Sequence, residues 1–133
     1  MNVVMGQFTV GTYNVHHAAL DVEPDIWDRR RSGVVARIRA ADPAVIGLQE
    51  CGPEQHADIA AELSGYEWCG LADDPRTGEN NPIGVRSGLS LVDTGTTWLS
   101  ESGDRGSVGW DAAYTRVLTS ARVRDPRSGR EFL

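Results

Sequence analysis

The sequence contains no lysine: all 13 basic residues among its 133 are arginine, against 19 aspartates and glutamates, and the net charge is −6. A negatively charged surface repels nucleic-acid backbones at long range, so the composition excludes a protein that coats DNA by charge alone. It still permits a local arginine site for a phosphate group, because the planar guanidinium binds phosphate through two donors.

Cysteine is also scarce, since only Cys51 and Cys69 are present. Their spacing matches no metal-binding motif and two thiols do not make a disulfide scaffold, so we expect free thiols and a cytoplasmic protein. No apolar run approaches the length of a membrane span, and the first ten residues lack the basic and apolar regions of a signal peptide. With 40% hydrophobic residues, residues 1–133 can form one domain core.

The first part of the chain predicts a strand followed by a helix. Residues 7–15 (QFTVGTYNV) alternate in polarity and are rich in β-forming residues, which is typical of a strand. From Trp27 to Ala41 the apolar residues share one helical face. Asp25 is the expected N-cap of this helix, and Asp42-Pro43 is expected to end it.

A second strand and a second helix follow. Residues 44–48 are an apolar run closed by Gln49-Glu50, which predicts a strand buried on both faces. Pro53 suits the first position of a helix, and Gly65 comes after its last apolar residue, Leu63. Strand–helix–strand is a crossover unit, and such crossovers make the two strands parallel.

The second half of the chain changes character and predicts short strands separated by polar loops. Ser87-Gly88 is typical of the turn of a hairpin. The expected strands are residues 66–70, 82–86, 89–92, 96–99, 113–124 and 131–133, and the longest loops are ADDPRTGENN and SESGDRGSVGWD.

Polar side chains stand at the ends of both strands of the crossover unit. Asn14 is near the end of the first strand, and Glu50 follows the second. Parallel neighbours end at the same edge of a sheet, which is where open α/β sheets bind ligands. A carboxamide and a carboxylate are hard oxygen donors that suit Mg²⁺ with several waters retained. The sequence therefore predicts a metal site with Asn14 and Glu50 as ligands, with a helix cap or a surface residue as the alternative for Glu50.

An ordered series of motifs resembles a known family. "TYNV" is followed by "W…RR…VVARIRAADPAVIGLQE…Q", then by "GENNPIGVRSGLSLVDTGTTWLSE" and "GWDAAYTRVLTSARV". From about Phe8 to its end, the chain is similar to prokaryotic members of the endonuclease/exonuclease/phosphatase superfamily, which have the deoxyribonuclease I-like fold. The resemblance implies an α/β sandwich of two packed sheets, a phosphoric ester hydrolase activity and Mg²⁺ or Mn²⁺ as the cofactor.

The resemblance also implies roles for particular residues. Glu50 corresponds to a metal-ligating glutamate, and Asn14 to an asparagine that helps to hold the metal or the scissile phosphate. Glu79 and Asn81 would face the cleft as substrate contacts, with an exposed turn as the alternative. Arg116, expected on a strand beside the site, would contact phosphate, with a structural ion pair as the alternative.

The histidines and Cys51 are interpreted more simply. His16 is two residues after Asn14 and so on the same strand face, from which it could touch substrate. His17 is expected to point the other way, His56 to be an ordinary helix residue, and Cys51 to be a packing residue.

Two features depart from the family pattern. Gly84-Val85 replaces the aromatic pair that relatives often carry there, which predicts looser packing. The chain also lacks the Thr-His, Asp-x-Asn and Ser-Asp-His motifs with which relatives continue, and which would supply the general base and part of the metal site. We therefore expect the chain to be about the first half of the fold and inactive alone, because metal-assisted attack without a positioned base is slow.

Three interpretations follow for function. The first is part of a metal-dependent phosphoesterase whose substrate is a phosphate ester, with a small phosphoester slightly favoured over nucleic acid by the acidic charge. The second is a short protein that binds metal, phosphate or a partner without catalysis. The third is a half that self-associates, or is complemented by a separate C-terminal half, through an open sheet edge.

Overall fold

The computed structural model describes residues 8–71 and 78–133. Gln7 of the first expected strand and residues 72–77 of the expected polar loop lie outside the described residues. The elements are β1 (Val10–Asn14), η1 (Ala18–Leu20), α1 (Trp27–Ala41), β2 (Val45–Gln49), α2 (Pro53–Glu62), β3 (Tyr66–Cys69), β4 (Ile83–Arg86), β5 (Ser90–Trp98), β6 (Val117–Arg124) and β7 (Glu131–Phe132).

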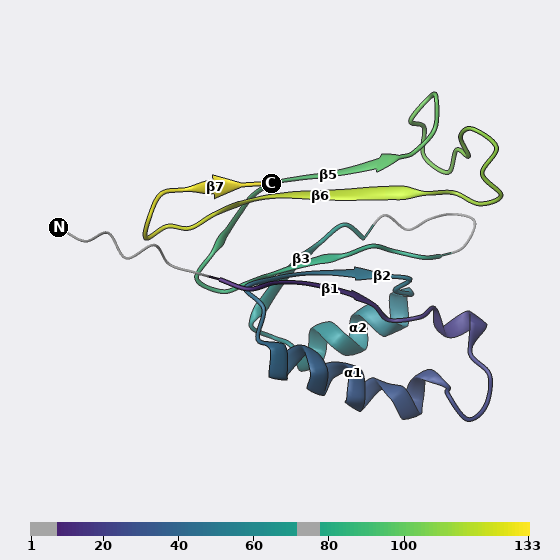
Figure 1. Cartoon of the computed structure of the whole chain (residues 1–133), viewed down its shortest axis with the longest axis horizontal. Helices are drawn as coiled ribbons and strands as arrows, with labels where there is room; N and C mark the ends of the chain where they lie inside the picture. Colours follow the sequence, from purple (N-terminus) through teal and green to yellow (C-terminus); the bar gives the residue numbers. More distant parts are fainter. Residues whose placement is uncertain (1–7, 72–77) are drawn as a thin grey trace.

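The described residues form three layers (Figure 1). One sheet has the strand order β1-β2-β4-β3, and a second has the order β5-β6-β7. Helices α1 and α2 cover the outer face of the first sheet, and the second sheet lies on the other side of it. No helix among the described residues is both long enough and apolar enough to cross a membrane.

Strand β2 is the centre of this arrangement. It runs parallel to β1, as the crossover pattern predicted, with Val10 opposite Val45 and Asn14 opposite Gln49. Alternate side chains of β2 point to opposite faces. Ile46 and Leu48 therefore join the core beneath the helices, whereas Val45 joins a second core between the two sheets. The prediction of a strand buried on both faces is confirmed.

Helix α1 packs on the sheet through the side chains that the apolar stripe indicated. Its buried residues are Trp27, Val34, Val35 and Ile38. The predicted N-cap was wrong: Ile26 occupies that position and makes no side-chain cap, while Asp25 lies one residue earlier. The helix ends where Asp42 adopts a left-handed backbone with φ of 41°, directly before a proline that cannot continue it.

The predicted hairpin at Ser87-Gly88 was also wrong. Strand β4 pairs with β2 and β3, whereas β5 pairs with β6 in the other sheet. The backbone N–H of Ser87 and its hydroxyl both donate to the carbonyl of Gly65, at 2.8 and 2.9 Å. This anchors the turn to the end of the first sheet, and the chain then crosses to the second.

Two predicted strand boundaries differ in the second sheet. Strand β5 is one strand with a register irregularity between Leu91 and Asp93, so the two short strands expected there are one. Strand β6 begins at Val117 rather than Ala113. Residues 113–116 belong instead to the connection that precedes it.

Packing around Gly84 is not loose. Trp68 lies opposite Gly84 in the β3–β4 pair, and a Cβ on Gly84 would meet the Trp68 ring at 2.9 Å. The indole thus occupies the space that a larger residue on β4 would need, and Val85 is 1% exposed. The expectation of looser packing at Gly84-Val85 is therefore wrong.

His56 on α2 makes the stability of this layer sensitive to pH. Its ring meets Trp68 edge-on with ring centroids 5.2 Å apart, and within the described residues its Nε2 has no hydrogen-bond partner. Burial lowers the pKa of His56 from its ordinary 6.5. A histidine with a lower pKa in the folded state binds its proton preferentially when unfolded. Its contribution is therefore present above pH 6.5 and is lost as pH falls.

We expect His56→Phe to reduce the pH dependence of stability. The native chain should lose free energy of unfolding between about pH 7.5 and pH 5, and the variant should lose less over the same interval. Urea denaturation followed by circular dichroism at several pH values measures both. Equal slopes for the two proteins would contradict the assignment.

Candidate active site

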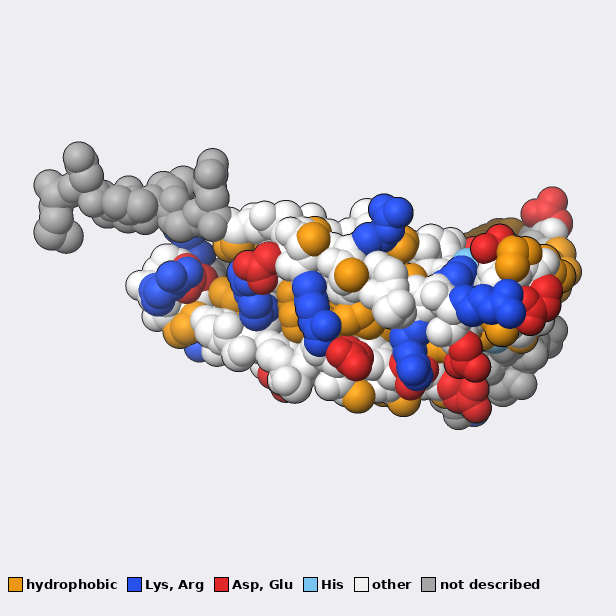
Figure 2. All heavy atoms as spheres, turned by 90° about the horizontal axis from the view of Figure 1, so that it is seen from below, with side chains coloured by type: hydrophobic (Ala, Val, Ile, Leu, Met, Phe, Trp, Pro, Cys, Tyr) orange, Lys and Arg blue, Asp and Glu red, His pale blue; other side chains and the backbone are white. Residues whose placement is uncertain are grey.

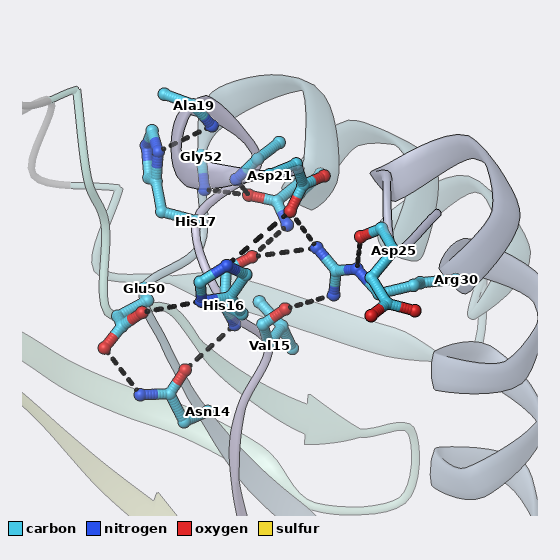
Figure 3. Close-up of polar contacts among 12 residues, drawn as sticks. Asn14, Val15, His16, His17, Ala19, Asp21, Asp25, Arg30, Glu50 and Gly52 are labelled. Carbon is cyan, nitrogen blue, oxygen red and sulfur yellow. Dashed lines mark hydrogen bonds and ion pairs between the residues drawn. The ribbon is translucent and has the colours of Figure 1, made fainter. Parts of the chain in front are cut away.

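The carboxyl ends of β1 and β2 bring an amide and a carboxylate into contact. The Asn14 Nδ2 donates to Glu50 Oε1 at 2.8 Å, as Figure 3 shows. Glu50 has a left-handed backbone, with φ of 53°, which is costly for a residue with a side chain. Reciprocal backbone hydrogen bonds of 3.1 and 2.9 Å between Cys51 and Asn80 hold the chain directly after it.

Asn14 is oriented by its own loop. Its Oδ1 accepts the backbone N–H of His16 at 2.9 Å, so its NH₂ group faces Glu50. His16 also has a left-handed backbone, with φ of 59°. The His16 ring lies between two acids, with Nδ1 3.8 Å from Glu50 and Nε2 3.8 Å from Asp21, too far for hydrogen bonds.

Arg30 of α1 fixes the loop that follows β1 (Figure 3). Its Nη1 donates to the Val15 carbonyl at 2.8 Å, its Nε to the Asp25 carbonyl at 2.7 Å, and its Nη2 to Asp21 Oδ1 at 2.7 Å. The Asp21 side chain is only 6% exposed. One guanidinium therefore joins both ends of the loop and neutralises a buried acid.

Gln55 of α2 holds the same loop from the other helix. It is 1% exposed, and its Nε2 donates to the His16 carbonyl at 2.9 Å. Its Oε1 accepts the backbone N–H groups of Ala18 and Gly52, each at 3.0 Å. The loops after β1 and β2 are thus fastened to each other.

Sequence reasoning missed Arg30, Asp21 and Gln55. Arg30 lies mostly off the apolar stripe of α1, which is the pattern of a solvent-facing residue. The available signals were the second arginine of "W…RR" and the glutamine that follows "QE" in the quoted motifs. Neither Arg30 nor Gln55 can be given a role from the sequence, because only the fold shows what its side chain contacts.

A pocket of about 470 Å³ opens beside Glu50. Glu79 and Arg116 line it, as does His17, which was expected to point away. That expectation is corrected, because His17 lines the pocket. It also caps η1 by accepting the Ala19 N–H at Nδ1.

The remaining predicted contacts lie at the side of this pocket. Asn81 donates from Nδ2 to the Val117 carbonyl at 3.2 Å, which links the first sheet to β6. With Glu79 and Arg116 it lines a smaller pocket of about 70 Å³. Arg116 directly precedes β6 instead of lying on it, is exposed, and donates to the Thr115 carbonyl at 3.2 Å.

The donors at this edge suit part of a divalent-metal shell. The Glu50 carboxylate is a hard oxygen ligand, and Mg²⁺ is commonly bound through one or two carboxylates with water completing the shell. The Asn14 amide turns its NH₂ group toward Glu50 and its Oδ1 toward the His16 N–H, so in this arrangement it orients the carboxylate. In residues 8–71 and 78–133, no group of three or more His, Cys, Asp and Glu side chains is placed to hold a metal. The case for a divalent ion at this edge therefore rests on the Glu50 carboxylate and on Asn14 beside it.

Cys51 takes no part in this chemistry. It is fully buried in the core beneath the helices, and burial raises the pKa of its thiol to about 12. A thiol that stays protonated is a poor nucleophile, which agrees with its interpretation as a packing residue.

Comparison with known proteins finds similarity among solved structures. No protein-family model matches the chain, and a search of curated proteins found no match. An endonuclease/exonuclease/phosphatase family protein from Bacteroides thetaiotaomicron matches with a TM-score of 0.85 and 32% identity, over 94% of this chain and 47% of that one. A mannosyl-6-phosphatase from Bacteroides thetaiotaomicron gives 0.86 and 31%, over 95% and 49%.

A Bacteroides vulgatus endonuclease/exonuclease/phosphatase matches with a TM-score of 0.84 and 31% identity, over 91% of this chain and 48% of that one. The two packed sheets with helices on one outer face match about half of the deoxyribonuclease I-like fold of these proteins. By fold the chain is similar to the endonuclease/exonuclease/phosphatase family proteins that it matches. It spans about half the length of the proteins it matches.

We expect Arg30→Met to cost about 2–3 kcal/mol of unfolding free energy, because it leaves the nearly buried Asp21 without its cation. Arg29→Met is the matched control, since Arg29 and its partner Glu23 are 60% and 65% exposed, and should cost under about 1 kcal/mol. Urea denaturation measures both. The double variant Arg30→Met/Asp21→Asn should recover part of the loss. Equal losses for the two arginines would contradict the role of Arg30.

Proposed function

We propose that the chain contributes the metal-binding and phosphate-facing part of a phosphoesterase that uses Mg²⁺ or Mn²⁺. The observation that carries the proposal is the contact between Asn14 and Glu50 at the shared edge of β1 and β2. The pocket beside this contact also holds Arg116. Similarity to endonuclease/exonuclease/phosphatase proteins supports the reaction class.

Each residue has a distinct part in this proposal. Glu50 holds the ion, and Asn14 orients the carboxylate and contributes an amide at the same edge. Arg116 meets the phosphate through its planar guanidinium. Glu79 lines the pocket as a substrate contact. A bound divalent ion would stabilise the negative charge that develops on phosphate oxygens during ester cleavage.

We propose a small phosphoester as the substrate. One of the similar structures is a mannosyl-6-phosphatase, and the net charge of −6 opposes long-range attraction of a nucleic-acid backbone. Figure 2 shows that basic and acidic side chains are interspersed over the helical side of the molecule. That face therefore does not present a basic stripe of the kind that tracks a nucleic-acid strand.

A second candidate is a half-domain that acts with another polypeptide. Strand β1 lies at the end of its sheet and pairs only with β2 among the described strands. An unpaired strand edge is a template for adding a further strand. A strand added beside β1 would lie next to Asn14, so a partner there could contribute to the site.

The metal site predicts a specific pattern of Mn²⁺ affinity. We expect Glu50→Gln to weaken Mn²⁺ binding at least about tenfold, because a neutral amide replaces the only carboxylate assigned to the ion. Asn14→Ala should weaken it less. Glu54→Gln removes an exposed carboxylate four residues away and serves as the control. Electron paramagnetic resonance titration of free Mn²⁺ measures all three, and native affinity in Glu50→Gln would contradict the proposal.

The 133-residue chain alone should not turn over p-nitrophenyl phosphate in the presence of Mg²⁺ or Mn²⁺, because the motifs that would supply a general base are absent from its sequence. Turnover that is lost in Glu50→Ala would contradict this. Activity that appears only when a second polypeptide copurifies would favour the half-domain candidate.

A further inference from the structure

The pocket beside Glu50 is lined by charged and by apolar side chains. Glu50 and Arg116 are among the charged ones, and Leu20 and Tyr114, which we call the apolar wall, are its largest apolar side chains. Leu20 ends η1, and Tyr114 belongs to the connection between β5 and β6. These two segments lie at the same end of the molecule (Figure 1). Two elements distant in sequence thus place apolar side chains on one pocket.

Both side chains are largely solvent-exposed, at 64% for Leu20 and 62% for Tyr114. Single exposed apolar residues are common on protein surfaces. Apolar walls with a few charged groups at one end are instead the usual composition of small-molecule pockets, and a volume of about 470 Å³ is within their ordinary range.

Leu20 is presented by a fixed support. His17 caps the short η1 helix, and Gln55 accepts the N–H of Ala18 at its start. The backbone N–H of Asp21 closes the helix on the Ala18 carbonyl at 3.1 Å. The backbone at Leu20 is therefore held beside the pocket.

The segment that carries Tyr114 is also held by internal contacts. The hydroxyls of Ser100 and Ser107 are 2.6 Å apart, and the N–H of Trp110 donates to Glu101 at 3.1 Å. Gly109 packs so closely that a Cβ there would lie 2.3 Å from the Cα of Ser100. The connection thus forms a packed loop of its own, and Tyr114 lies near the point where it joins β6.

We propose that Leu20 and Tyr114 bind the ring of a phosphomonoester, with its phosphate directed toward Arg116 and Glu50. This rests on the proposed function and names its ligand class: the monophosphate of a ring-shaped alcohol, such as a hexose or a nucleoside. A tyrosine ring offers a flat apolar face on which another ring can stack. An open-chain phosphomonoester of the same charge has no ring to stack, so we expect it to bind less tightly to Leu20 and Tyr114.

The test compares four probes on the full 133-residue chain with Mn²⁺ present: glucose 6-phosphate, adenosine monophosphate, glycerol 3-phosphate and inorganic phosphate. Isothermal titration calorimetry gives the affinities, and saturation-transfer NMR reports which ligand protons touch the protein. We expect at least one ring phosphate to bind at least about fivefold more tightly than glycerol 3-phosphate. Its ring protons should receive the strongest saturation transfer.

Variants test whether Leu20 and Tyr114 cause the preference for ring phosphates. Leu20→Ser and Tyr114→Ser should each remove most of the ring preference and leave inorganic phosphate binding unchanged. Val22→Ser and Trp110→Ser are the matched controls, because both residues are exposed, at 75% and 62%, and neither lines the pocket. The controls should retain the preference, and circular dichroism verifies that all four variants fold.

The outcomes separate this inference from the proposed function. Equal affinity for ring and open-chain phosphates, together with binding of inorganic phosphate that Arg116→Met weakens, would overturn the ring assignment alone. A ring preference that survives both wall variants would also overturn it. Failure of Mn²⁺ and of all four probes to bind would overturn the proposed function along with it. Comparison of glucose 6-phosphate with adenosine monophosphate decides between a sugar and a nucleoside.

Discussion

Asn14 and Glu50 meet because β1 lies parallel to β2 in the register that places Asn14 opposite Gln49. A slip of one residue would turn every side chain of β1 to the other face of the sheet, and the amide would no longer reach the acid. Strand β2 itself is fixed by burial on both faces, because its residues supply the core beneath the helices and also the core between the sheets.

The site is maintained by groups that do not belong to it. Two residues with left-handed backbones, His16 and Glu50, shape its loops, and such conformations persist where the surroundings determine them. Arg30 and Gln55 supply those surroundings from α1 and α2. The layer of helices therefore has two functions, since it covers the sheet with apolar side chains and holds the loops at its edge with polar ones.

Local signals predicted the first half of the fold well. The period of apolar residues in α1, the apolar run of β2 and Pro53 at the start of α2 each report on a short segment, and each agrees with the structure. The second half was less predictable. A Ser-Gly pair indicates a turn, but whether the flanking strands pair depends on partners elsewhere. Here β4 pairs with β2 and β3, and β5 pairs with β6.

The sequence by itself determined which segments become helices and strands in the crossover unit, that β1 and β2 are parallel, and that Asn14 and Glu50 share an edge. These follow from periodicity and from the handedness of crossovers, which act within a few dozen residues. Only the tertiary structure decided that Arg30 faces the loop after β1, that His17 lines the pocket, and that Leu20 and Tyr114 line the same pocket. Those contacts join segments distant along the chain, and only the packing of the layers brings such segments together.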